Sequence, residues 1–284
     1  MRNIFIALLA LTMPVAALAQ VAEGDQHWNA RAEGHVGGRA KAAQIDAAIA
    51  AYQRAVAASP NDVEARWKLL RAYRFKGAYV AASNDEKKKI YGDAKKAGEG
   101  ALAVVDNLLK AKGVTSVAKA TEKRVADVAR TIPGAGETFL WDAINWGEWA
   151  LAYGKMAAAR EGAADRIKRE ATIAMLVDPR MDGGSPQRVL GRLHDQTPRI
   201  PFLTGWASSK EAVRFLNESL KVDPTNKITK VFLAEAMVSN DSHTGPQAVQ
   251  MLKETIAAPN PPEFEVENAA AVDDARALLK KWGA

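Results

Sequence analysis

Residues 48–73 read AIAAYQRAVAASPNDVEARWKLLRAY, and residues 212–237 read AVRFLNESLKVDPTNKITKVFLAEAM. Both stretches place small, apolar and proline residues at spacings of 4, 3, 5, 9 and 4. In the first stretch these are Ala48, Tyr52, Ala55, Pro60, Leu69 and Tyr73. In the second they are Ala212, Leu216, Ser219, Pro224, Leu233 and Met237. Steps of four and three keep side chains on one helix face, and a proline ends a helix. This pattern is typical of tetratricopeptide-type helical hairpins, which bury their faces only by stacking.

A third, looser copy of the pattern lies between these two. It runs through Ile167, Ala171, Ala174, Pro179, Leu190 and His194, with two extra residues after the proline. Pro179 and Pro224 are 45 residues apart (224 minus 179), so about eleven residues are inserted into a 34-residue repeat, around residues 197–206. We therefore predict an all-α fold of stacked antiparallel hairpins, a degenerate tetratricopeptide-type solenoid or bundle, forming a single domain over residues 39–284 that is interrupted by an ordered loop.

The N-terminal residues predict export. Arg2 precedes an apolar run from Ile4 to Val15, and Ala17-Leu18-Ala19 has the small-x-small pattern of a signal peptidase site. We predict a cleaved signal peptide over residues 1–19, a flexible glycine-rich lead-in over residues 20–38, and a periplasmic mature protein. The chain contains no cysteine, which excludes disulfides and a lipid-anchor thiol. No later stretch is apolar enough to span a membrane, so we expect the mature chain to be soluble.

Composition and motifs argue against an enzyme. The formal net charge of +6 is spread along 284 residues, without the concentrated basic stripe that a nucleic-acid-binding protein needs. The four histidines are isolated, so no metal site is expected, and neither a nucleophile elbow nor a phosphate-binding glycine loop is present. We predict no catalytic residues and no cofactor.

The candidate binding residues are Trp146, Trp149, Tyr153, Arg188 and His194. The three aromatic residues can share one helix face, and flat rings either fill a core or line an apolar groove for an organic ligand. Arg188 follows the predicted helix start at Ser185-Pro186, where it can bind a carboxylate or only face solvent. His194 occupies the repeat position of Tyr73 and Met237, which suits either a core or a groove residue.

Several motifs in order along the chain resemble the T-component family of tripartite ATP-independent periplasmic (TRAP) transporters. They are the helix from Trp141 to Trp149, Asp178-Pro179, Gly183-Gly184, Arg188-x2-Gly191, Thr204-Gly205-Trp206, Lys210-Glu-Ala212, Val222-Asp-Pro224 and Leu233-Ala-Glu235, together with the earlier stretch from Trp67 to Gly77. The resemblance covers most of the mature chain.

The resemblance implies a periplasmic, non-enzymatic accessory protein that forms homo-oligomers. It also implies association with a TRAP solute-binding protein and with a small hydrophobic or organic-acid ligand. Some family members are lipoproteins, but that property does not carry over to a chain without cysteine. The alternative is a general periplasmic tetratricopeptide scaffold that holds an extended peptide of an envelope protein.

Overall fold

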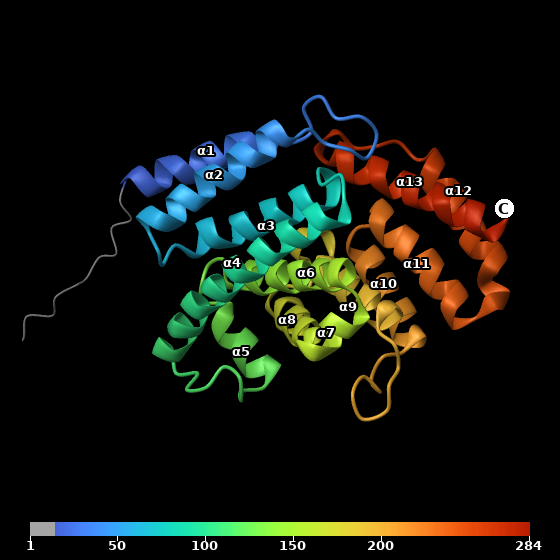
Figure 1. Cartoon of the computed structure of the whole chain (residues 1–284). Coiled ribbons are helices and arrows are strands. Elements are labelled where there is room, and N and C mark those ends of the chain that lie inside the picture. Colours follow the sequence, from blue (N-terminus) through green and yellow to red (C-terminus); the bar gives the residue numbers. More distant parts are fainter. Residues whose placement is uncertain (1–14) are drawn as a thin grey trace, which may run out of the picture.

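The computed structural model describes residues 15–284, and this part of the chain is all-α (Figure 1). It contains thirteen α-helices and no β-strand over those residues. The helices are α1 Val15–Asn29, α2 Ala42–Ala58, α3 Val63–Tyr79, α4 Asn84–Ala111, α5 Glu122–Ala129, α6 Ala135–Tyr153, α7 Lys155–Arg160, α8 Ala163–Val177, α9 Ser185–Gln196, α10 Ser209–Val222, α11 Lys227–Asn240, α12 Gly245–Ala257 and α13 Glu265–Trp282. The predicted fold class is confirmed.

The two regular copies of the sequence pattern form equivalent hairpins. Pro60 lies in the turn between α2 and α3, and Pro224 lies in the turn between α10 and α11. Two residues after each proline an N-cap side chain begins the next helix: Asp62 accepts the amide of Ala65 at 3.0 Å, and Asn226 accepts the amide of Thr229 at 3.0 Å. Each cap satisfies an amide that the helix itself leaves unbonded. The repeated spacing thus specifies both the end of one helix and the start of the next.

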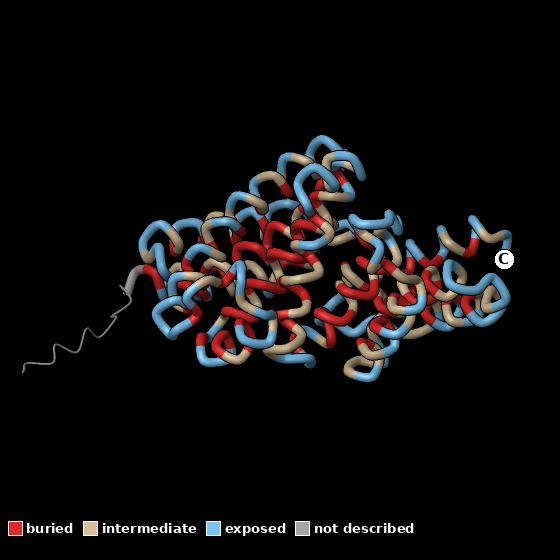
Figure 2. The backbone as a smooth tube through the Cα atoms, turned by 90° about the horizontal axis from the view of Figure 1, so that it is seen from below, coloured by how far each residue is buried: buried red, intermediate tan, exposed pale blue. Residues whose placement is uncertain are grey.

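The small residues of the pattern bring the helices of each hairpin close together. Ala48, Tyr52 and Ala55 of α2 are fully buried, and so are Ala212, Leu216 and Ser219 of α10. Successive helices pack against one another along the chain, and buried residues are distributed through the stack (Figure 2). The amphipathic faces are therefore buried by neighbouring hairpins, as the repeat predicts.

The two ends of the stack meet. The loop after α1 lies beside α13 (Figure 1), and Arg31 forms an ion pair with Glu267 at 3.0 Å. Arg31 also donates to the backbone oxygen of Glu263 at 2.8 Å. A Cβ on Gly38 would lie 2.5 Å from the Cα of Ala270, so only glycine permits this approach. The loop between α1 and α2 thereby contacts α13 and joins the two ends of the stack into a ring.

The predicted flexible lead-in over residues 20–38 is wrong for its first half, because residues 20–29 belong to α1. Gly24 lets α1 approach α2 so closely that a Cβ there would be 2.4 Å from the ring of Tyr52. Asp25 accepts the Tyr52 hydroxyl at 2.8 Å and the Lys68 ammonium at 2.7 Å. These interhelical contacts stabilise a segment whose composition alone suggests a loop.

The N-terminal part of the predicted signal peptide, residues 1–14, lies outside the described residues, whereas residues 15–19 form the start of α1. Within the described chain, none of the helices combines the length and the apolar character needed to cross a membrane.

Candidate functional site

Trp146, Trp149 and Tyr153 share one face of α6, as their spacing predicts. The rings of Trp146 and Trp149 meet edge to face with centroids 5.5 Å apart, and Trp149 stacks on Tyr153 at 4.8 Å. Both tryptophans are buried in a cluster with side chains of α4, α8, α9 and α10, whereas Tyr153 is 43% exposed. The Lys95 ammonium lies 4.4 Å from the Trp146 ring centroid. These tryptophans pack between helices, and their contact with a ligand stays a prediction.

His194 lies at the edge of the same cluster. Its ring stacks on Phe215 at 5.6 Å and meets Trp206 edge to face at 5.2 Å. Its Nδ1 accepts the amide of Ser208 at 3.2 Å, which places the proton of the neutral ring on Nε2. Burial lowers the pKa of His194, so the ring is neutral at pH 7. This residue connects α9 to the start of α10.

Arg188 belongs to a different neighbourhood from the other four predicted residues. Its Nη1 donates to the Thr229 hydroxyl at 3.3 Å, and its Nη2 donates to the Ser185 hydroxyl. The nearest carboxylate oxygen, that of Asp182, is 3.6 Å away. The Ser185 hydroxyl in turn donates to Asp182 at 2.9 Å. Two neutral hydroxyls and the Asp182 carboxylate therefore hold the guanidinium in position.

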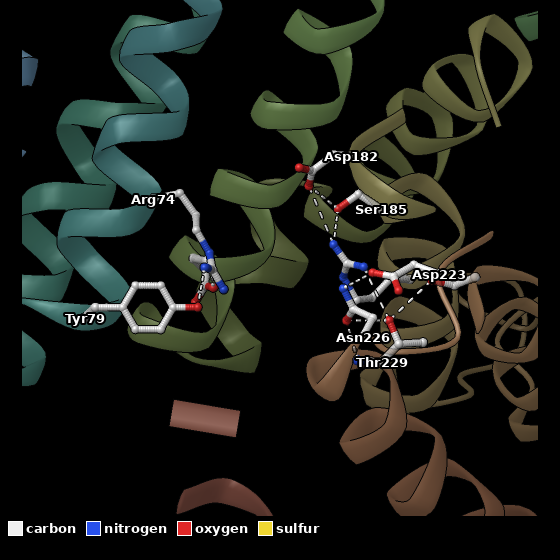
Figure 3. A network of polar contacts seen from close by, with 10 residues as sticks. Arg74, Tyr79, Asp182, Ser185, Asp223, Asn226 and Thr229 are labelled. Atoms are coloured by element: carbon white, nitrogen blue, oxygen red, sulfur yellow. Dashed lines mark hydrogen bonds and ion pairs between the residues drawn. The ribbon is translucent and has the colours of Figure 1, made fainter. Parts of the chain in front are cut away.

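Arg74 and Tyr79 of α3 point toward the cluster that contains Ser185 and Thr229 (Figure 3). Arg74 donates to the Tyr79 hydroxyl at 2.7 Å, and its Nε lies 3.4 Å from a carboxylate oxygen of Glu148. The Arg74 side chain is 22% exposed.

The two arginines influence each other. Burial lowers the pKa of Arg188, Asp182 offsets part of this effect, and the positive charge of Arg74 adds to it. A guanidinium stays protonated at any physiological pH. The lowered pKa of Arg188 therefore means that burial disfavours its positive charge by more than the neighbouring carboxylates favour it. Such an arrangement can accept an anionic oxygen between α3 and α9.

Several residues of the resemblance motifs join α9 to α10 and α11. Gly184 has a φ of +78° and packs on α10, where a Cβ would lie 3.0 Å from the backbone oxygen of Ser219. Gly191 allows a second close approach, with Leu216 Cγ 2.5 Å from the position of a Cβ. Glu235 of α11 pairs with Arg192 at 2.5 Å. These contacts pack α9, α10 and α11 into one unit.

A buried acidic pair, Asp142 and Glu170, was not anticipated from the sequence. The Asp142 carboxylate is fully buried and accepts from Arg166 at 2.8 Å, and Glu170 lies 3.0 Å from the same guanidinium. Burial and the proximity of Asp142 raise the pKa of Glu170 well above its ordinary value. Their spacing from Arg166, 24 residues in one case and four in the other, gave no signal of a three-residue cluster.

Arg74 and Tyr79 were also missed as site residues, because they belong to the first hairpin, and α3 approaches α9 only through packing of both helices against α6. Over residues 15–284, no group of three or more histidine, aspartate or glutamate side chains is arranged to hold a metal ion.

Comparison with known proteins gives a fold likeness only. No family model matches the sequence, and no curated protein matches it. Among solved structures, yeast Tom70 is similar at 12% identity and a TM-score of 0.30, over 93% of this chain and 65% of Tom70. The chain therefore spans less than two thirds of that protein, and a likeness at this TM-score supports no inference about function.

Proposed function

We propose that this chain is a non-enzymatic binding component of a TRAP-type uptake system, exported to the periplasm, where it associates with a solute-binding protein. The single observation that carries the proposal is that several of the resemblance motifs meet in one packed unit. Gly184 and Gly191 let α9 pack closely on α10, and Glu235 of α11 pairs with Arg192 of α9. Arg188 lies on α9 between the two glycines.

Arg188 then binds the anionic group of a small organic acid. The hydroxyls of Ser185 and Thr229 orient its guanidinium, so little conformational entropy is lost when a carboxylate binds. Arg74 and Tyr79 contribute further donors from the opposite side. Bidentate pairing of a guanidinium with a carboxylate is both strong and geometrically selective. The neighbouring carboxylates of Asp182 and Glu148 would disfavour ligands with several adjacent negative charges.

The test of the partner is co-purification from the native host. The chain is expressed with its own leader and a C-terminal tag and recovered from the periplasmic fraction, and bound proteins are identified by mass spectrometry. We expect a TRAP solute-binding protein at near-stoichiometric amount and an N terminus at Gln20. Recovery from the cytoplasm would contradict the proposal. Retention of envelope-assembly proteins without a solute-binding protein would also contradict it and would favour the peptide-binding scaffold.

The same preparation tests self-association. The resemblance implies a homo-oligomer, so light scattering coupled to size exclusion should give a mass that is a multiple of the monomer. A monomer at micromolar concentration would remove that part of the proposal while leaving the partner result unaffected.

A further inference from the structure

The loop between α9 and α10 exposes a group of apolar side chains. Phe202 is fully exposed, Leu203 is 68% exposed and Ile200 is 44% exposed. The loop projects away from the stacked helices (Figure 1). Globular proteins do expose single apolar residues, but three within four positions at the tip of a projecting loop form a local apolar surface that the fold leaves uncovered.

This loop has a defined conformation. The Thr204 hydroxyl accepts the amide of Ile200 at 3.1 Å and donates to the backbone oxygen of Pro198. At its base, the Trp206 indole donates to Asp165 of α8 at 2.9 Å. Phe202 has a φ of +64°, a left-handed conformation that is unfavourable for a large side chain. The surrounding hydrogen bonds hold Phe202 outward at the cost of backbone strain.

The charged residues within the loop itself are basic, whereas the acidic residues Asp165, Asp195 and Glu211 lie next to it. Residues 197–210 contain Arg199 and Lys210 and no acidic residue. Both line a pocket of about 300 Å³ at the base of the loop, together with Ser209 and His194. Asp195 also lines this pocket, but it is paired with Arg192 at 3.1 Å. Among the described residues, neither Arg199 nor Lys210 at the base of the apolar tip forms an ion pair with a carboxylate.

A second segment on the same side has the same character. Leu151 and Met156, at the end of α6 and in α7, are 65% and 71% exposed. Residues 151–160 also contain two basic residues and no acidic one. The bond from Trp206 to Asp165, three residues beyond the α7–α8 turn at Gly162, places the base of the loop next to this segment.

We propose that the loop of residues 198–206 docks on the surface of a membrane that contains anionic phospholipid, with Phe202 and Leu203 entering the headgroup region and Arg199 and Lys210 contacting lipid phosphates. A convex tip of three side chains buries far less than the roughly 1,200 Å² of a stable protein interface. A bilayer accepts such a protrusion without a complementary pocket. Apolar side chains flanked by cations are the combination that binds anionic membrane surfaces.

The experiment is vesicle flotation with the exported form of the protein, so that the apolar run of residues 1–14 does not contribute. Vesicles of phosphatidylglycerol and phosphatidylethanolamine are compared with vesicles of phosphatidylcholine alone. We expect binding to the anionic vesicles that weakens as salt concentration rises. Phe202→Asp should reduce the partition coefficient by about tenfold or more, because it replaces the aromatic ring that enters the headgroup region with a charge. Arg199→Gln combined with Lys210→Gln should reduce binding to anionic vesicles only.

The matched control is Val36→Asp, which introduces the same charge at a site that is 78% exposed and far from the loop in sequence. It should leave flotation unchanged. Circular dichroism and thermal melting of every variant establish that the fold is intact. The proposal is overturned if the parent protein does not float with anionic vesicles, or if Phe202→Asp floats as well as Val36→Asp. Loss of solute-binding-protein capture by Phe202→Asp with flotation unchanged would instead identify the loop as a protein-docking element and equally overturn the membrane proposal.

Discussion

Gly98 of α4 and Asp142 of α6 approach so closely that a Cβ on Gly98 would lie 1.7 Å from Asp142 Oδ1. Glycine at this position lets a carboxylate enter the interior between two helices. Because Asp142 is held by Arg166, it has little freedom to move away from an added methyl group. The contact therefore favours glycine at position 98 of α4 and limits where the buried pair of Asp142 and Glu170 can lie.

Gly98→Ala should destabilise the protein, although alanine is the better helix former. We expect a loss of about 1–3 kcal/mol from overpacking against Asp142. Gly147→Ala is the matched control, since Gly147 lies within α6 with nothing within 4 Å of an added Cβ. That change should be neutral or stabilise by up to about 1 kcal/mol. Urea denaturation measures both, and equal effects of the two substitutions would refute the close contact.

Stability should depend on the protonation of Glu170. Burial, the charge of Asp142 and the limited compensation by Arg166 raise its folded-state pKa, and burial also raises that of Asp142. A raised pKa means that the folded state holds the proton more tightly than the unfolded state. This stabilisation is fully present below the ordinary pKa near 4.5 and is lost as pH rises through the folded-state pKa.

Glu170→Gln should therefore flatten the dependence of unfolding free energy on pH above about pH 5, by an amount on the order of 1–2 kcal/mol. Exposed Glu161, which pairs with Lys95 on the surface, provides the control substitution Glu161→Gln. Chemical denaturation at a series of pH values gives the profiles. If the Glu170→Gln and parent profiles are parallel, the buried pair does not retain a proton.

Arg188→Gln should weaken carboxylate binding without unfolding the protein. A charge-assisted hydrogen-bonded pair contributes enough for its loss to raise the dissociation constant about tenfold or more. Isothermal titration with a panel of mono- and dicarboxylates measures the effect, and Arg214→Gln, on the exposed face of α10, serves as the control. Arg188→Lys keeps the charge but not the planar fork and should restore only part of the affinity. A lowered melting temperature with unchanged affinities would mean that Arg188 only supports the fold.

Ring closure should make a substitution in α13 affect the first hairpin. Arg31 and Glu267 are 7% and 12% exposed, so Glu267→Ala leaves a buried, unpaired guanidinium. We expect a loss of about 3 kcal/mol and faster hydrogen exchange in α1 and α2 as well as α13. The control is Asp273→Ala on the same helix, which removes an exposed partner of Arg276 and should cost less than about 0.5 kcal/mol. Exchange confined to α13 would show that the two ends are not coupled.

The sequence predicted the helical hairpins because their signals are local. Pro60 and Pro224, with the N-caps that follow them, define two turns regardless of what surrounds them. Gly77 shows why glycine is a weaker signal: it lies inside α3, where the absence of a Cβ admits the ring of Tyr91 from α4. A glycine needed for close packing and a glycine needed for a turn look the same in one sequence.

The candidate site was predicted only in part for a related reason. Arg188 could be selected because it follows a helix start, a local feature. Arg74 lies 114 positions earlier (188 minus 74), and it comes near Arg188 because α3 and α9 both pack against α6. The tryptophans were selected for their size and spacing, but whether a ring faces a groove or a core depends on the helices that cover it.

The contact of Gly38 with Ala270 has a consequence for how this architecture can change over generations. An open array of hairpins gains or loses units by duplication or deletion, since each unit contacts only its neighbours. Here an inserted hairpin would separate Gly38 from Ala270 and leave Arg31 without Glu267. The number of hairpins is therefore fixed by geometry, and new binding properties must arise within the existing units or in the loops that project from them.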